Sequence, residues 1–193
     1  MQPIAALFSI LAALAAPAGQ VPVLSSHGTA IPPSAASPAP GAAAAGAGLA
    51  FDLPAAWVRQ TPSSSMRLAQ ASIPGAAGPG QFALFFFGPG GGGGAEVNIN
   101  RWVEQIAQPV APPHRETFTT AGLKITWVDV AGTMKPSAVG MGPSTAQPHT
   151  RVLGAVVEGP GGPWFAKVYG PDATVAAARG AFLAVLHGMR PRA

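Results

Sequence analysis

One short stretch of the sequence combines side chains suited to binding a small polar molecule. Asn98, Asn100, Arg101 and Trp102 bring amide, guanidinium and indole groups close together along the chain. An arginine beside an indole can present a planar donor and an aromatic face to a ligand. The same residues also fit a structural role, in which Asn100 caps a helix, Trp102 enters the core and Arg101 faces water. They are the ligand-binding candidates of the sequence, and both interpretations stand.

The other reactive residue types form no recognisable catalytic or metal-binding pattern. The glycine tract 88–94 is not followed by the Lys-Ser/Thr pair of a phosphate-binding loop, and Glu96 would repel phosphate. None of the 4 histidines has a second histidine or a carboxylate at metal-ligand spacing. The chain has 0 cysteines, which excludes disulfides and thiolate sites. We expect no catalytic residue, no metal and no cofactor; the alternative is a hydrolase or other enzyme with an unrecognised site.

The N-terminal quarter of the chain differs in composition from the rest. Ile4 to Ala16 is an apolar run with small residues after it, which is typical of a signal peptide and short for a transmembrane helix. We predict a signal peptide over residues 1–18, and an exported protein, periplasmic or extracellular, with no transmembrane anchor after cleavage. Residues 19–48 are uncharged and rich in Ala, Pro and Gly, and predict a disordered tether. The folded domain is then 49–193.

The charge of the chain argues against one class of partner. The formal net charge is +4 and the pI about 10.4, with the basic residues spread singly along the sequence. Nucleic-acid binders usually concentrate basic residues on one stripe. We therefore expect no nucleic-acid partner.

Alternating and continuous apolar runs predict the strands that must position the candidate residues. Phe82 to Phe87 reads as a strand buried on both faces, at the centre of a sheet. In the strand over 66–73, Arg67 falls awkwardly on the face of Ala69, Ala71 and Ile73. A long loop is expected over 132–150. The other predicted strands are 49–53, which Pro54 ends, and two hairpins, 117–120 with 123–130 and 151–157 with 164–169.

Two helices are predicted. A short central helix begins at Arg101, with Trp102, Val103, Ile106 and Ala107 at helical spacing, and ends before Pro109. A C-terminal helix follows Gly170-Pro171-Asp172, and we expect Arg179 on its water-facing side, where its removal would hardly change stability. The expected fold is α+β, a mostly antiparallel sheet covered by both helices. The buried stripe of the C-terminal helix comprises Val175, Ala178, Phe182, Val185, Leu186 and Met189.

The pattern Phe51-Asp-Leu53-Pro54-Ala-Ala-Trp57, the hairpins and the closing helix resemble the Mog1/PsbP-like fold. Members of that group often begin with an F-x-x-P-x-x-W kind of pattern and end with a helix packed on an antiparallel sheet. The stretch 98–105 is similar to one in uncharacterised secreted bacterial proteins. The group includes photosystem accessory subunits, a GTPase-binding protein and bacterial lipoproteins, so the resemblance implies no single activity. This chain departs from the lipoproteins because it lacks a lipobox cysteine.

These observations favour a non-enzymatic binding or accessory domain of the cell envelope. Its expected partner is a protein or small ligand of the envelope, of unknown identity. A further alternative is an envelope protein that meets anionic surfaces through its scattered arginines.

The export prediction can be checked directly on native protein. N-terminal sequencing should find a first residue between Ala16 and Val21, because the small-x-small cleavage sites lie there. Recovery of cytoplasmic protein that still begins at Met1 would contradict it.

Overall fold

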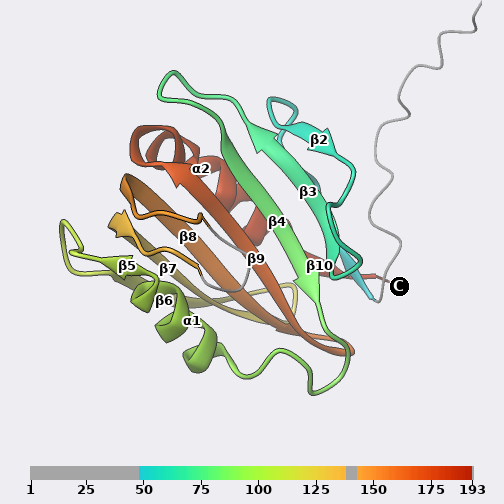
Figure 1. Cartoon of the computed structure of the whole chain (residues 1–193). Helices are drawn as coiled ribbons and strands as arrows, with labels where there is room; N and C mark the ends of the chain where they lie inside the picture. The colour runs from blue at the N-terminus through green and yellow to red at the C-terminus, as the bar shows by residue number, and fades with distance from the viewer. Residues whose placement is uncertain (1–47, 138–142, 193) are drawn as a thin grey trace, which may run out of the picture. The chain divides into compact units, whose positions relative to one another are not determined.

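The computed structural model describes residues 48–137 and 143–192, and its main element is an eight-stranded antiparallel sheet (Figure 1). The strands follow the order β2-β3-β4-β9-β8-β7-β5, and β6 pairs with β7 alongside β5. A separate two-stranded sheet joins β1 to β10. The elements are β1 (Leu49–Ala50), β2 (Val58–Gln60), β3 (Arg67–Ile73), β4 (Gly80–Phe86), α1 (Ala95–Glu104), β5 (Ile106–Ala107), β6 (His114–Thr120), β7 (Leu123–Met134), β8 (Gln147–Gly159), β9 (Gly162–Pro171), α2 (Asp172–His187) and β10 (Arg190–Pro191).

The α+β class and the antiparallel sheet agree with the sequence prediction. The apolar run forms β4 between β3 and β9, and Phe82, Ala83 and Leu84 are buried as predicted. The second half of the run is not, because Phe85 and Phe86 are half-buried and Phe87 is exposed beyond the end of the strand. Both predicted hairpins form, as β6–β7 and β8–β9. Their strands are longer than predicted, because β7 continues to Met134 and β8 starts at Gln147, inside the expected loop. Part of that loop, residues 138–142, lies outside the described residues, as do the predicted signal peptide and all but the last residue of the predicted tether.

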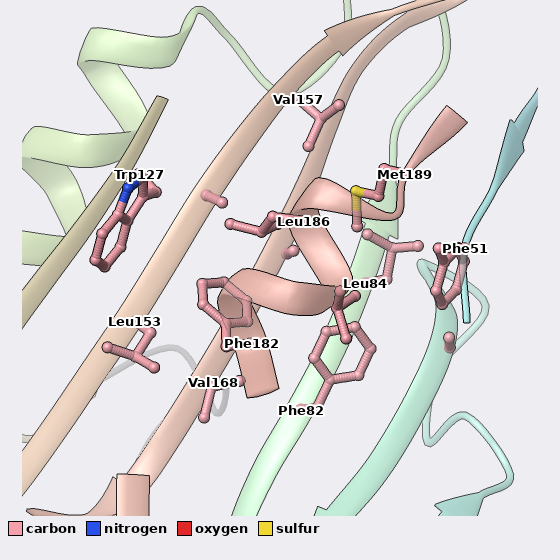
Figure 2. Packing of buried hydrophobic residues seen from close by; sticks show 14 of the residues in the cluster. Phe51, Phe82, Leu84, Trp127, Leu153, Val157, Val168, Phe182, Leu186 and Met189 are labelled. Carbon is pink, nitrogen blue, oxygen red and sulfur yellow. The ribbon is translucent and has the colours of Figure 1, made fainter. Parts of the chain in front are cut away.

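One face of the sheet packs against α2 and forms the larger hydrophobic core (Figure 2). Phe182 of α2 is fully buried in this core, together with Phe82 and Trp127 of the sheet. All residues of the predicted stripe are buried, although Met189 lies beyond the end of α2 and is not part of the helix. Each large apolar side chain removed from water contributes about 1.5–3 kcal/mol, so this contact supplies much of the stability of the domain.

The opposite face carries a second, smaller core under α1. Ile99 and Trp102 of α1 pack with Val128, Val152 and neighbouring apolar residues of β7, β8 and β9. Gly154 makes room for the indole, because a Cβ there would lie 2.2 Å from Cε3 of Trp102. α1 packs over β7 and β8, and in the described parts of the chain no helix covers the β3–β4 half of this face (Figure 1).

Two local predictions are wrong. The central helix begins at Ala95, not Arg101, because extended Gly94 is its N-cap and Glu96 lies in its first turn, where a carboxylate complements the helix dipole. Asn100 is therefore inside the helix rather than at its cap. Ile106 and Ala107 leave the helix and pair with the end of β7. The strand predicted over 49–53 is shorter, because β1 contains only Leu49 and Ala50.

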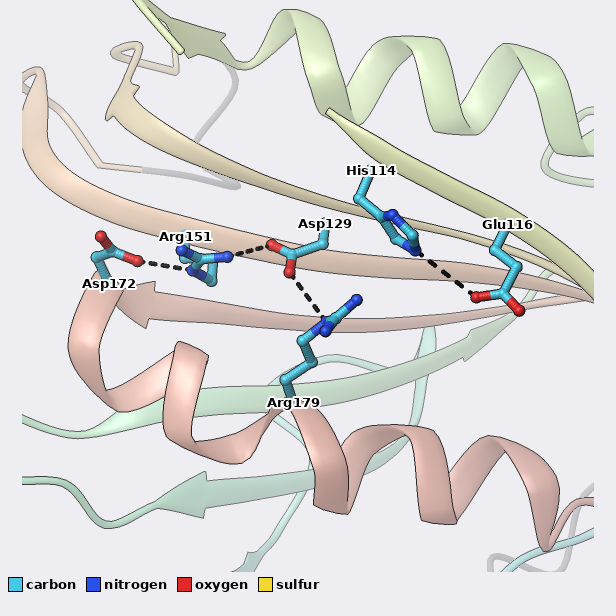
Figure 3. Close-up of polar contacts among 6 residues, drawn as sticks. All are labelled: His114, Glu116, Asp129, Arg151, Asp172 and Arg179. Carbon is cyan, nitrogen blue, oxygen red and sulfur yellow. Dashed lines mark hydrogen bonds and ion pairs between the residues drawn. The ribbon is translucent and has the colours of Figure 1, made fainter. Parts of the chain in front are cut away.

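A chain of ion pairs ties the first half of α2 to the sheet (Figure 3). Asp129 is only 7 % exposed, and its carboxylate lies 2.7 Å from Nη1 of Arg151 and 3.2 Å from Nε of Arg179. Nε of Arg151 donates to Asp172 at 2.6 Å, in the first turn of α2. Burial disfavours the charged form of Arg151, but its bonds to Asp172 and Asp129 outweigh this and raise its pKa.

The water-facing position predicted for Arg179 is wrong. The residue lies three positions before Phe182 and four after Val175, so it borders the buried stripe rather than opposing it. Its guanidinium carbon lies 5.1 Å from the centroid of the Trp127 ring. The N–H at Nε is not aligned with Asp129, so their contact is an ion pair without a hydrogen bond. A buried carboxylate is costly unless cations lie near it, so the position of Arg179 beside Asp129 is favourable.

Truncation of Phe182 tests the packing of α2. Phe182→Ala should destabilise the domain by about 3–5 kcal/mol, since it leaves a cavity in the larger core. Gly180 is exposed on the same helix with open space around it, so Gly180→Ala should instead stabilise by about 0.5–1 kcal/mol. Urea unfolding of both variants measures the difference. Wild-type stability of Phe182→Ala would mean that α2 does not cover the sheet.

Truncation of the ion-pair residues tests the network. Asp129→Ala should cost about 3–5 kcal/mol, because it leaves two guanidinium groups without their shared buried carboxylate. Arg179→Ala should cost less, about 1–2 kcal/mol, because Arg179 is partly exposed and Arg151 still pairs with Asp129. Asp52, an exposed partner of Arg190, is the control, and Asp52→Ala should change little. Equal effects of Asp129→Ala and Asp52→Ala in urea unfolding would refute a stabilising network.

Candidate functional site

The uncovered half of the α1 face carries an unusual set of polar side chains for the middle of a sheet. Residues paired across neighbouring strands point to the same face, so the register places them in rows. Gln70 of β3 and Lys167 of β9 flank Ala83 in one row. The row on one side holds Arg67, Phe85 and Phe165, and the row on the other side holds Ser72, Gln81 and Tyr169.

A β-bulge brings Arg67 to this face. The register of β3 against β4 shifts between Arg67 and Ala69, so that Leu68 is an extra residue on β3. Because side chains alternate along a strand, one extra residue reverses the side to which the preceding residues point. Arg67 therefore lies over the Phe85 ring, 5.5 Å from its centroid, and not with Ala69 and Ala71 in the larger core, as the sequence predicted.

An open groove of about 930 Å³ begins beside Arg67. It lies between the turn before β4, the start of β8 and the junction of β9 with α2. Thr174 holds the turn by donating a hydrogen bond to the carbonyl of Gly78 at 2.8 Å. Grooves of this size accept small organic ligands. Its polar lining includes Arg67, Gln81, Gln147, His149 and Tyr169, and its apolar lining includes Met134.

Two further cationic side chains, Lys167 and Arg101, lie in the neighbourhood of Arg67 but outside the lining of the groove. Nζ of Lys167 donates to Oε1 of Gln105 at 2.7 Å and lies 5.5 Å from the centroid of the Tyr169 ring. Arg67 and Arg101 approach it closely enough to act on its charge. Over residues 48–137 and 143–192, none of these three cations forms a salt bridge with a carboxylate. Arg67, Lys167 and Arg101 are called the cation cluster below.

The environment of Lys167 disfavours its ammonium form. Partial burial is the main cause, and repulsion from Arg101 and Arg67 adds to it, so that the pKa falls to about 8. Neutral amides surround the cluster instead of acids. Gln70 accepts from Nη1 of Arg67 at 2.9 Å and donates to Gln60 at 3.2 Å, which fixes the arginine in place.

The structure separates the four candidate residues named from the sequence. Arg101 belongs to the cation cluster, and Asn98 positions it by accepting a hydrogen bond from its Nη2. Asn98 is buried and also donates to the carbonyls of Gly92 and Gly94, at 2.8 and 3.0 Å, so it anchors the glycine tract to α1. Trp102 is a core residue and Asn100 is exposed, and neither contributes to the cluster.

Sequence reasoning missed Lys167, Gln81 and Tyr169. A signal was present, because Lys167 interrupts an otherwise apolar strand at a position that alternates with core residues. Its meeting with Arg67 and Arg101 depends on strand order, on the bulge and on the placement of α1. Those are long-range features that no local pattern contains.

Comparison with known proteins gives no family for this chain: no family model and no curated protein matches it. Among the helices that the structure describes, none combines the length and apolarity that a bilayer crossing requires. Within the same residues, no group of three or more His, Asp or Glu side chains gathers as a metal-ligand set would.

The shifted pKa of Lys167 predicts a pH dependence of stability. Because folding lowers the pKa of this base from 10.5 to about 8, the unfolded chain binds more protons between those values. The free energy of unfolding should therefore rise with pH across that window in the wild type. Lys167→Met should lack this rise, whereas Lys124→Met, at an exposed lysine, should keep it. Urea unfolding at a series of pH values makes the comparison, and identical slopes in all three proteins would contradict the lowered pKa.

Proposed function

We propose that this chain is an exported, non-enzymatic binding domain whose ligand lies in the groove with an anionic group against the cation cluster. The observation that carries the proposal is the convergence of Arg67, Lys167 and Arg101 without a carboxylate partner among the described residues. Elsewhere in the described fold, Arg151 and Arg179 share a buried acid. Like charges held together without an acid cost free energy, and a bound anion removes that cost.

The surroundings of the cluster fit recognition of a carboxylate or phosphate group. A guanidinium presents several N–H donors in a plane that matches these groups, and an ammonium adds a compact charge. Tyr169 and Gln81 hydrogen bond to each other in the groove wall and can orient a neutral part of the ligand. The apolar lining beyond them suits a short hydrocarbon or aromatic body.

The groove favours binding over hydrolysis. Its histidine, His149, makes no described hydrogen bond to a serine or threonine hydroxyl, so no nucleophile–base pair is formed there. Its carboxylate, Asp172, is occupied by Arg151. A groove with fixed cations and amides but no activated nucleophile is suited to holding a ligand.

Export and family membership are part of the same proposal. The apolar run over 4–16 supports export, and the uncharged tract after it would separate the domain from its N-terminus. An antiparallel sheet closed by a C-terminal helix is compatible with the Mog1/PsbP-like resemblance. An accessory role in the cell envelope, with a small anionic ligand or an anionic group on a partner protein, is consistent with both.

Anion binding can be tested by calorimetric titration with succinate, benzoate and inorganic phosphate. At least one probe should bind, and Arg67→Gln should weaken it by about 10-fold to 100-fold, because a hydrogen bond to a charged group contributes about 1.5–3 kcal/mol. Arg59 is exposed on β2 and pairs in register with Ala71 of the larger core, so it points to the other face.

Arg59→Gln is therefore the matched control, since it removes the same charge from the opposite face and should leave affinity nearly unchanged. Equal weakening in both variants would mean that total charge, and not the cluster, attracts the anion. No binding of any probe would argue against the proposed site.

A further inference from the structure

A second β-bulge lies on the far side of the groove and contains His149. The pairing of β7 with β8 shifts between Gly132 and Met134, where β8 has one residue more than β7. The extra residue falls at Pro148-His149, and the φ of His149 is 53°, in the left-handed region. Side chains other than glycine are uncommon in this region, and such residues are concentrated at functional sites.

The bulge accounts for the presence of His149 in the wall of the groove. Side chains alternate along a strand, and Arg151, two residues further on, contacts α2. Strict alternation would therefore place His149 on the α2 face as well. His149 instead lines the groove together with Gln81 and Tyr169, whose side chains lie on the opposite face of the sheet.

The two bulges on the sides of the groove have the same effect. The extra residue Leu68 brings Arg67 to the groove from β3, and the bulge of β8 brings His149 to it, although β4 and β9 separate these two strands. Bulges beside functional sites commonly redirect a side chain in this way. The groove therefore has a redirected guanidinium on one side and a redirected imidazole on the other.

We propose that Arg67 and His149 bind the two ends of one elongated dicarboxylate, in which a hydrocarbon chain joins the carboxylate groups. This inference rests on the proposed function, because it requires an anion in the groove. Arg67 holds one carboxylate, and His149 donates a hydrogen bond to the other. An imidazole can do so in either protonation state, since at least one of its nitrogens carries a proton.

The register indicates the length of the ligand. The row of side chains that contains Arg67 crosses β8 at Val156, about seven residues from His149. With about 4.8 Å between strands and about 3.3 Å per residue, the Cα atoms of Arg67 and His149 are roughly 25 Å apart. At about 1.5 Å per bond, the two side chains span roughly 10 Å of this, which leaves about 15 Å between their donor atoms.

A dicarboxylate of about eight carbons matches this gap. Extended suberate has its carboxylate carbons about 9 Å apart, and a hydrogen bond of about 2.8 Å at each end extends its reach to about 15 Å. The wall between the two ends suits its methylene groups. Pro79, Pro171 and Met134 line the groove, and Tyr169 and Gln81 already hydrogen bond to each other.

The test is calorimetric titration of the full chain with adipate, suberate and sebacate, the dicarboxylates of six, eight and ten carbons. At least one should bind about 10-fold more tightly than succinate, which is too short, and than octanoate, which lacks the second carboxylate. His149→Gly should remove this advantage and leave the affinity for octanoate unchanged. Glycine adopts a φ of 53° readily, so the variant should melt no lower than the wild type.

Ala121→Gly is the matched control. Ala121 has a φ of 46° in the turn between β6 and β7, so its replacement relieves the backbone in the same way outside the groove. Its affinity for every probe should equal that of the wild type. Proton NMR of the histidine rings gives a second readout. The resonance that is missing from His149→Gly should shift in the wild type when the best dicarboxylate is added, and should not shift with octanoate.

The outcomes separate this inference from the proposed function. If octanoate binds through Arg67 but no long dicarboxylate binds more tightly, or if His149→Gly binds them as Ala121→Gly does, the inference is overturned and the anion site remains. If the wild type binds none of these probes and neither benzoate nor phosphate, the proposed function fails and the inference fails with it.

Discussion

The arrangement of this domain depends on how two helices share the two faces of one sheet. α2 presents an apolar stripe, and Phe182 at its centre is buried in one core with Phe82 and Trp127, so this face serves the stability of the domain. α1 is shorter and buries little more than Ile99 and Trp102, enough to cover β7 and β8. The β3–β4 half of this second face is therefore not packed beneath a helix. Polar and charged side chains can occupy that half without disrupting a core.

The two faces handle charge in opposite ways. Near α2, Asp129 and Asp172 balance Arg151 and Arg179, and the result is a structural connection between helix and sheet. Near α1, arginine and lysine side chains are held by glutamine and asparagine amides. Amides fix the direction of a cation without neutralising it. In the proposed function, an anion would therefore meet a cluster whose geometry is already set.

Local patterns in the sequence predicted what local physics determines. The apolar run over 82–87, the hairpin turns and the stripe of α2 each follow from spacing along one element, and each is present. The errors came from interactions between elements. Ile106 pairs with β7 instead of extending the helix, and the bulge after Arg67 exchanges the faces of β3. Of the candidate site, only Arg101 and its support Asn98 were named from the sequence. Lys167 joins them because its side chain reaches Gln105 at the end of α1, and that neighbourhood is a property of the fold.

The pairing of β1 with β10 has a consequence for how the domain can be joined to other chains. Leu49 is opposite Pro191, and the backbone N–H of Arg192 donates to the carbonyl of Gly48 at 2.7 Å, so the chain enters and leaves the domain at one point. Folds whose ends are neighbours tolerate circular permutation and insertion into a host loop, since a short connection closes the gap without strain. This domain could therefore be inserted into a loop of another protein, with both of its ends joined to the host at neighbouring positions. Its groove and cation cluster would then be displayed without any change to the sheet that carries them.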